Sequence, residues 1–140
     1  MPANMSRMTW QITSIAAESI RSHERRVHPE EACGLLFGGD RRIEEAVPAP
    51  NVSPTPRHRF EIDPKALFSA LRAERQGGPR LLGYYHSHPS GTFDPSETDA
   101  KLAQPDGRLW LIAAEGRIAG FIAGNTGIHG RFQPIALDED

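Results

Sequence analysis

Apolar residues in the first part of the chain recur with the period of a helix. Between residues 12 and 28 they return every three or four positions, and charged residues such as Arg21 lie between them. This pattern predicts an amphipathic helix whose apolar face, which includes Ile15 and Ile20, packs on a core. Pro29 follows the segment, and the residue before a proline disfavours the helical conformation, so we expect the helix to end there.

Downstream, the pattern changes to short apolar runs separated by turn residues, which is typical of strands. Tight turns are expected at residues 115–116 and 124–125, and the proline-rich segment 48–57 is expected to be a loop. The apolar runs predict strands over residues 31–38, 42–47, 59–62, 80–86, 108–114, 117–123 and 128–133.

Two further helices are predicted from their first residues. Asp63-Pro64 and Asp94-Pro95 each supply an acidic N-cap followed by a proline, which suits the first helical position. The first of these helices is expected to end near residue 76, where a Gly-Gly-Pro sequence follows, and the second near residue 103.

Length and composition fit one ordinary domain, with 140 residues of which 38% are hydrophobic and 24% charged. We therefore expect a single domain over residues 1–140, with its core at about 10–134, of the α/β or α+β class. In this fold, helices flank a mixed, mostly antiparallel sheet. The net charge of −2 lacks the basic excess of a nucleic-acid-binding domain. The single cysteine, Cys33, excludes an intramolecular disulfide and a multi-cysteine zinc site.

The sequence also bears on where the protein works. No stretch approaches the ~18 apolar residues that a membrane span needs. Residues 1–10 lack the basic start and apolar centre of a secretory signal. We therefore expect a cytoplasmic protein that contacts neither membrane nor nucleic acid. The oligomeric state stays open, with a dimer as one option.

The most informative segment is HSHPSGTFDPSETD, which runs from His86 to Asp99. Alternate residues of a strand project from the same side, so His86 and His88 at a strand end can share one cation. Zinc accepts imidazole and carboxylate ligands, and a catalytic zinc site takes three of them from the protein. The histidine pair therefore predicts a metal site that lacks one ligand.

The helix predicted to begin at Asp94 supplies that ligand. With Asp94 as N-cap and Glu97 at the third helical position, a capping box accounts for both acids. Ser96 and Asp99 are three residues apart, so they share one helix face. Asp99 is then the carboxylate left to bind metal, beside the hydroxyl group of Ser96.

Two histidines and one aspartate leave a fourth position for water, and zinc lowers the pKa of such a water to about 7. A second carboxylate outside the metal ligands is needed to move the proton of that water. Position alone does not choose among Glu30, Glu31, Glu61 and Glu97. The pattern predicts a catalytic zinc site and leaves its general base open.

These residues resemble the motif of the JAMM (JAB1/MPN/Mov34, or MPN+) zinc metalloproteases. The resemblance rests on His-Ser-His-Pro from His86, on Ser96 and Asp99 at the family's spacing, and on Glu-Ala-Cys-Gly-Leu-Leu-Phe-Gly from Glu31. It covers residues 18–132, which is most of the chain. It implies a cytidine-deaminase-like fold, in which helices flank a sheet.

The resemblance also implies a role for each matching residue. His86, His88 and Asp99 would bind Zn²⁺. Glu31 would be the general acid and base, and Ser96 would donate a hydrogen bond to the oxyanion of the reaction. The implied activity is that of a zinc metallopeptidase.

The chain resembles the compact prokaryotic members of the family more than the longer members that cut ubiquitin chains. This implies a small ubiquitin-like or sulfur-carrier protein as substrate, cut after its C-terminal Gly-Gly at a peptide or isopeptide bond. Release of cysteine from a carrier adduct is one example. A Gly-Gly tail can enter a slot too narrow for side chains, and an extended tail can pair with a strand edge. The carrier, the residue released and any gating by the loop 48–57 stay open.

Each of these residues also has a plainer explanation. His86 and His88 could be ordinary histidines at a strand end, and Asp99 a first-turn acid favoured by the helix dipole. Ser96 could be a small residue at a helix start, and Glu31 a solvated residue before a strand. Their joint occurrence favours the catalytic site.

Other functions fit the sequence less well. A non-catalytic MPN-like scaffold or ubiquitin-like-protein binding module is the main alternative, but such proteins lack the ligand set that this chain keeps. A zinc nucleoside deaminase needs a Pro-Cys-x-x-Cys motif. Cys33 is alone and is expected to be a packed small residue, since free cysteine is usually buried. An amidohydrolase barrel needs a far longer chain.

Overall fold

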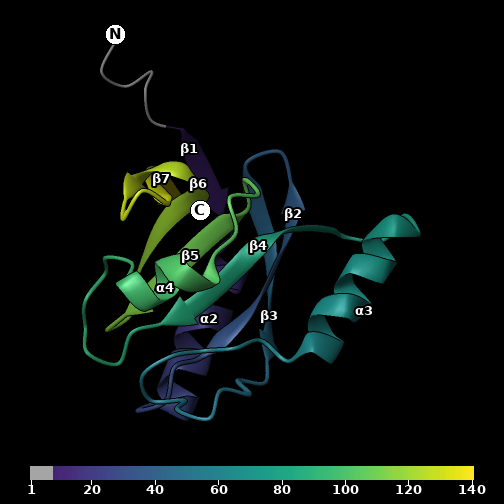
Figure 1. Ribbon diagram of the computed structural model, residues 1–140. Helices are drawn as coiled ribbons and strands as arrows, with labels where there is room; N and C mark the ends of the chain where they lie inside the picture. Colours follow the sequence, from purple (N-terminus) through teal and green to yellow (C-terminus); the bar gives the residue numbers. More distant parts are fainter. Residues whose placement is uncertain (1–7) are drawn as a thin grey trace, which may run out of the picture.

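The computed structural model describes residues 8–140, in which a closed sheet is flanked by helices (Figure 1). Residues 1–7, most of the segment considered for a secretory signal, lie outside the described residues. The elements run in the order β1 (Thr9–Ile12), α2 (Ser14–Val27), β2 (Cys33–Gly39), β3 (Arg42–Ala49), α3 (Pro64–Arg75), β4 (Arg80–Ser87), α4 (Glu97–Leu102), β5 (Leu109–Ala114), β6 (Arg117–Ile128) and β7 (Phe132–Glu139).

The strands of residues 8–140 are ordered β1-β3-β2-β4-β5-β6-β7, and β7 pairs with β1 to close the barrel. The pairs β1–β3, β1–β7 and β4–β5 are parallel, and the other pairs are antiparallel, so the sheet is mixed. The predicted arrangement of helices flanking a mixed sheet is confirmed. Within the described residues, no helix is long and apolar enough to cross a membrane.

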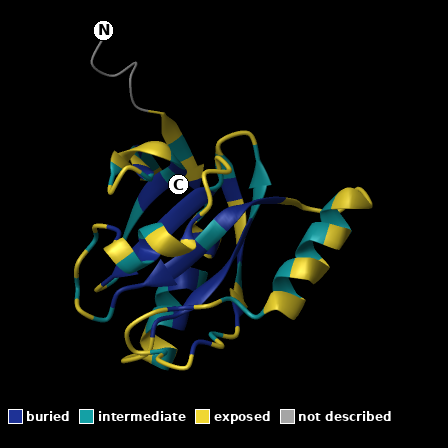
Figure 2. Ribbon diagram, in the orientation of Figure 1, coloured by how far each residue is buried: buried dark blue, intermediate teal, exposed yellow. Residues whose placement is uncertain are grey.

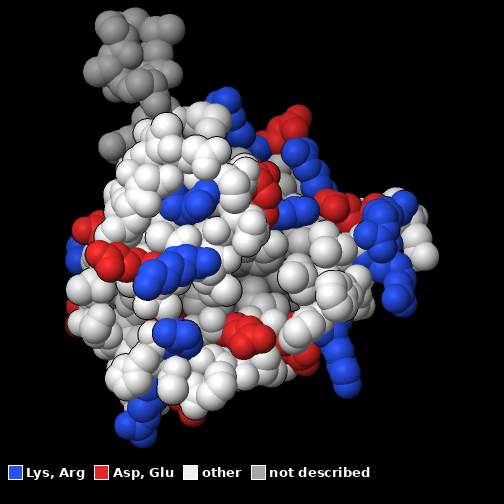
Figure 3. All heavy atoms as spheres, viewed as in Figure 1, with Lys and Arg blue, Asp and Glu red and all other residues white. Residues whose placement is uncertain are grey.

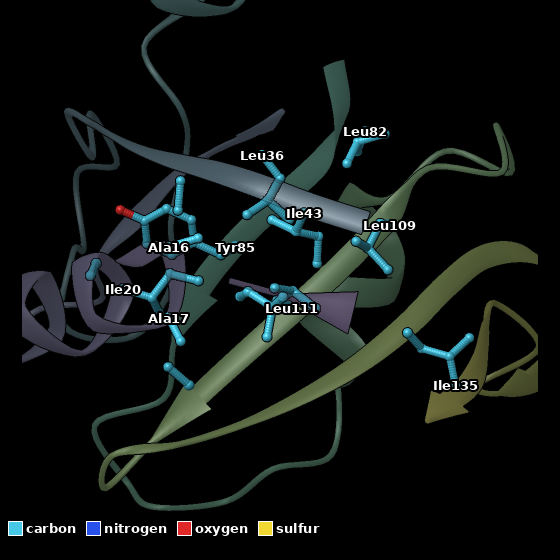
Figure 4. Close-up of a cluster of buried hydrophobic side chains, with 14 residues drawn as sticks. Ala16, Ala17, Ile20, Leu36, Ile43, Leu82, Tyr85, Leu109, Leu111 and Ile135 are labelled. Carbon is cyan, nitrogen blue, oxygen red and sulfur yellow. The ribbon is translucent and has the colours of Figure 1, made fainter. Parts of the chain in front are cut away.

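The core divides between the two faces of the sheet. Alternate residues of a strand point to opposite faces. Leu109 and Leu111 of β5 therefore join the cluster beneath α2, and Trp110 joins the other cluster with Phe60 and Phe132. Figure 4 shows the first cluster, in which residues of α2 meet residues of several strands. Fully burying one such side chain stabilises the fold by about 1.5–3 kcal/mol.

The first predicted helix is correct in place but wrong at its start. Thr13 is the N-cap of α2, and its side chain accepts a hydrogen bond from the backbone N–H of Ala16. Ile12 belongs instead to β1, a strand that was not predicted because its partners, β3 and β7, both lie far from it in the sequence. Ile15 is 81% exposed, so its predicted place in the core is wrong. The buried face of α2 consists of Ala16, Ala17, Ile20 and His23.

The end of the chain also differs from the prediction. The turn expected at residues 124–125 lies inside β6, whose pairing with β7 shifts register there instead of reversing. The chain reverses after residue 128, where His129 and Gly130 have positive φ angles of 54° and 65°. As a result, β7 starts at Phe132 and reaches β1. The expected strand over residues 59–62 is only an isolated bridge from Ile62 to Asn51.

Candidate metal centre

His86 lies at the end of strand β4, and His88 lies just beyond that end. His86 lies opposite Cys33 of β2 and Ile112 of β5, and it is completely buried. His88 follows the strand, and its backbone N–H donates to the carbonyl of Ala113 at 2.9 Å, which continues the pairing with β5. The two Nε2 atoms lie 3.1 Å apart, so both imidazoles point to the same place.

Helix α4 brings Asp99 to the same place through a cap that differs from the predicted one. Ser96 is the N-cap: its Oγ accepts from the N–H of Asp99, and the Asp99 Oδ2 accepts from the N–H of Ser96, both at 3.0 Å. The predicted capping box of Asp94 and Glu97 is wrong. The carbonyl of Pro95 accepts from His129 Nε2 at 3.0 Å, which holds this segment in the lead-in to the helix rather than in its first turn.

The three side chains form a cluster with the spacing of metal ligands. Asp99 Oδ2 lies 3.2 Å from His86 Nε2 and 3.1 Å from His88 Nε2. Tetrahedral zinc with bonds of about 2.0–2.1 Å separates its ligands by about 3.3 Å. All three residues are buried. The donor set and its spacing therefore fit a zinc ion.

Charge within the cluster favours an ionised carboxylate. Burial opposes ionisation of Asp99, but hydrogen bonds from His86 and His88 hold its pKa well below its usual range. Burial lowers the pKa of the completely enclosed His86. Burial also acts against a charged His88, but the hydrogen bond to Asp99 raises its pKa overall. The cluster is an anion flanked by two nitrogen donors.

The outer contacts of the two histidines differ. His88 Nδ1 donates to the carbonyl of Thr92 at 3.0 Å, which directs Nε2 toward the cluster. Gly91 permits this turn, because its φ of +89° is unfavourable for residues with a side chain. His86 has no such partner within residues 8–140, and its ring is instead stacked on Phe60 with centroids 4.3 Å apart.

Glu31 lies two residues before the first residue of β2, and it is only 7% exposed. Its Oε1 is buried and has no hydrogen-bond partner among the described residues. Burial raises the pKa of its carboxyl group to about 7, and the nearby His88 opposes this shift. Such a group can exchange a proton near neutral pH.

Asn51 holds the backbone of Glu31, and sequence reasoning missed it. Its Nδ2 donates to the carbonyls of Glu31 and Arg59, at 3.0 and 3.2 Å. Its Oδ1 accepts from the backbone N–H groups of Ser53 and Glu61. The available signal was the Asn-x-Ser sequence in the proline-rich loop, since asparagine often bonds to the backbone two residues later.

The cluster opens onto a cavity of about 180 Å³. Glu31, His88 and Ser96 line it, together with Arg57, His58 and the turn after His88. The other candidate bases lie elsewhere: Glu61 faces a neighbouring cavity, and Glu30 and Glu97 are exposed. The geometry therefore brings Glu31, and no other acid among those four, to this cavity.

The comparisons with known proteins identify the family. Residues 13–127 match the family of prokaryotic homologs of the JAB domain. The chain belongs to this family. The JAMM/MPN resemblance predicted from the motif is thereby confirmed.

This JAB-family chain is similar to several named proteases. It is 38% identical over 121 residues to a desampylase of Haloferax volcanii, a match that covers 79% of this chain and 87% of the relative. It is 44% identical over 87 residues to a Thermus thermophilus protein named "Probable TtuB-protein conjugate cleaving protease". That match covers 62% of this chain and 58% of the relative. It is 36% identical over 95 residues to the CysO-cysteine peptidase of Mycobacterium tuberculosis, covering 66% and 64%.

Solved structures show the same fold. A Desulfitobacterium hafniense protein superposes on the JAB-family chain with a TM-score of 0.77 at 30% identity, covering 95% and 94% of the two chains. A JAB1/MPN domain protein of Archaeoglobus fulgidus superposes with a TM-score of 0.61 at 18% identity, covering 94% and 96%. The second likeness shows the fold alone. The finer expectation of a cytidine-deaminase-like fold stays a prediction.

Cys33 of the JAB-family chain is packed, as predicted. Its side chain is completely buried, and its Sγ lies 3.7 Å from the carbonyl oxygens of Ala49 and Pro50. Burial raises the pKa of the thiol to about 12, which opposes formation of a nucleophilic thiolate. Cys33 is therefore poorly suited to act as a nucleophile at this site.

Proposed function

We propose that the protein is a zinc-dependent peptidase that cuts after the C-terminal Gly-Gly of a small ubiquitin-like or sulfur-carrier protein. The proposal rests mainly on one observation: the buried His86–His88–Asp99 cluster and the buried Glu31 carboxyl group lie at one cavity. The Oε1 of Glu31 has no hydrogen-bond partner among the described residues. The names of the relatives, which include a desampylase and a CysO-cysteine peptidase, support the substrate class.

In this proposal, His86 Nε2, His88 Nε2 and Asp99 Oδ2 hold the zinc ion. When bound there, zinc supplies a water of lowered pKa and polarises the carbonyl group of the scissile bond. Asp99 accepts a hydrogen bond from the backbone N–H of Ser96, and His88 donates one to the carbonyl of Thr92, so two of these ligands are oriented before any metal binds.

Glu31 is the proposed proton carrier. Its pKa of about 7 lets the carboxylate accept a proton from water and return it to the leaving amine. Ser96 is the proposed oxyanion donor. Because the Ser96 Oγ accepts from the N–H of Asp99, its hydroxyl hydrogen is free to point into the cavity.

A second cavity, of about 260 Å³, offers a path for the carrier tail. It lies between the 53–61 segment and α4, and it reaches the cluster at Asp99. Phe60 and Leu102 also line a third cavity, of about 220 Å³, between α3 and the barrel. Figure 3 shows this part of the surface hollowed and largely uncharged. We place the tail in the second cavity and the carrier body over the third.

Helix α3 supports that placement. It buries none of its residues, as Figure 2 shows, and Phe68 on it is 62% exposed. Large exposed apolar side chains beside a cavity favour a protein partner.

The test is cleavage of a carrier extended past Gly-Gly, followed by mass spectrometry. We expect the zinc-loaded protein to release the extension, a chelator to stop the reaction, and added zinc to restore it. His88→Ala should lose both bound zinc and cleavage. Tight binding of the carrier without cleavage, by a protein with a full complement of zinc, would instead favour the binding-module alternative.

A further inference from the structure

The cavity at Glu31 is where the leaving group must lie. If Glu31 passes its proton to the departing amine, that amine lies within hydrogen-bond reach of its carboxyl group. The part of the substrate beyond the scissile bond then occupies the cavity of about 180 Å³. A water molecule takes about 30 Å³ of liquid, so this space suits something of the size of one residue.

Arg57 faces the same cavity with its charge uncommitted. Five other arginines each lie within 4.0 Å of a carboxylate, namely Arg21, Arg25, Arg42, Arg80 and Arg108. Among residues 8–140, Arg57 has no acidic partner and no side-chain hydrogen bond. Glu31 forms no ion pair with it, since no Arg57–Glu31 pair lies within 4.0 Å. A guanidinium group with free donors is therefore available to a ligand.

The backbone holds Arg57 next to the reacting groups. The carbonyl of the preceding residue, Pro56, accepts from the N–H of Glu31 at 2.8 Å. Thr55 accepts from the N–H of His58 at 3.0 Å, which closes a turn around Arg57. The imidazole of His58 lines the cavity as well. The position of Arg57 is thus tied to that of Glu31.

The chemistry of an amino acid matches this arrangement. Its carboxylate carbon is two bonds from its amine nitrogen, so an amine at Glu31 places a free α-carboxylate close by. The planar guanidinium group binds a carboxylate through two parallel hydrogen bonds. A lysine side chain, as leaving group of an isopeptide, presents only an uncharged aliphatic stem there.

We propose that Arg57, with His58 beside it, binds the free α-carboxylate of a single amino acid as leaving group. This rests on the proposed peptidase function. It makes Arg57 a specificity-determining residue that favours carriers extended by one residue over isopeptide conjugates.

The test compares two carriers that differ only at the last group, one ending in Gly-Gly-Ala with a free acid and one ending in the alaninamide. We expect wild-type kcat/KM to favour the acid by about 10- to 100-fold, as for loss of a charged bidentate contact. Arg57→Gln should remove this preference: cleavage of the carrier with the free acid should slow, and cleavage of the carrier with the amide should not change. Arg26→Gln, at an exposed position of α2 outside this cavity, should keep it.

Equal wild-type rates for acid and amide, or an Arg57→Gln change that slows both alike, would overturn the proposal. A binding measurement separates it from the peptidase function. The zinc-loaded protein, titrated with free alanine and followed by NMR, should show shifts of the Arg57 side chain that alaninamide does not cause. Alanine shifts without cleavage of any carrier would reject the peptidase and keep the subsite, and no shift at millimolar alanine would reject the subsite.

Discussion

The proposed metal ligands and the proposed proton carrier, Glu31, are held in place in different ways. His86, His88 and Asp99 come from a strand and a capped helix, and they are bonded to one another. Glu31 lies just outside a strand, its side chain has an unpaired oxygen, and its backbone is held by the loop that contains Asn51. Regular structure thus builds the metal cluster, whereas long-range contacts place the carboxyl group that would use it.

Asp99→Asn removes the charge of the cluster and should have the largest effect. An asparagine oxygen can still accept from the N–H of Ser96, so α4 should stay capped while metal binding is lost. We expect near-complete loss of both zinc, by metal analysis, and cleavage, with an unchanged circular dichroism spectrum. Asp94→Asn is the control and should change neither. Full zinc content in Asp99→Asn would show that this carboxylate is only a cap.

Glu31→Gln should separate the proton carrier from the metal cluster. The amide keeps the size of the side chain but cannot carry a proton, so turnover should fall by about 10²–10⁴-fold. Zinc content should stay at the wild-type level. Glu30→Gln, at the neighbouring exposed position, should leave turnover unchanged. A normal rate in Glu31→Gln would mean that another group moves the proton.

The free energy of unfolding of the metal-free protein should show how much the ionised Glu31 destabilises the fold. Its pKa rises from 4.5 to about 7 in the folded state, so the folded chain binds more protons than the unfolded chain between these values. Stability should therefore fall as pH rises through this window, by at most about 3 kcal/mol. In urea unfolding with chelator, Glu31→Gln should be more stable than wild type at pH 8 and no more stable at pH 4. If Glu31→Gln and wild type were equally stable at pH 8 and at pH 4, a buried, ionisable Glu31 would be ruled out.

Asn51→Ala should have the smallest effect of the four and should act only on the Glu31 part of the site. It leaves the carbonyl of Glu31 without its hydrogen bond, so we expect kcat to fall about 10-fold while zinc stays bound. The free energy of unfolding should fall by about 1–3 kcal/mol. KM should change little, because the Asn51 side chain bonds to backbone groups and lines none of the three cavities proposed for the substrate. Asn125→Ala, in β6, is the matched control; equal kcat losses in both variants would remove Asn51 from the site.

Much of the fold was predictable from local signals. Asp63 caps α3 and Pro64 is its first residue, as predicted, because both preferences act within one turn of the chain. The common direction of His86 and His88 follows from the period of a strand. Asp99 was predicted to lie beside them because Asp94 was expected to be the N-cap of α4, but the N-cap is Ser96. The structure places it there through Ser96, and its role as a metal ligand stays a prediction.

The contacts that were missed join residues far apart in the chain. Strand β1 is stabilised by pairing with β7, more than 120 residues later. No local pattern in its four residues predicts this pairing. Asn51 reaches Glu31 across 20 residues, and the Ile15 side chain is exposed although its spacing suited the core. Backbone hydrogen bonds between distant segments depend on how the whole sheet closes.

By itself, the sequence determined the residue types of the site and the local geometry of the histidine pair, since strand period and motif spacing act over a few residues. Strand period and motif spacing left four glutamates open as the general base, and the family resemblance implied Glu31. The tertiary structure brings Glu31 and Arg57 to one cavity beside the His86–His88–Asp99 cluster. This arrangement arises where the loop 51–60 packs against the start of β2 and the end of β4, and packing between distant segments is not encoded in any one of them.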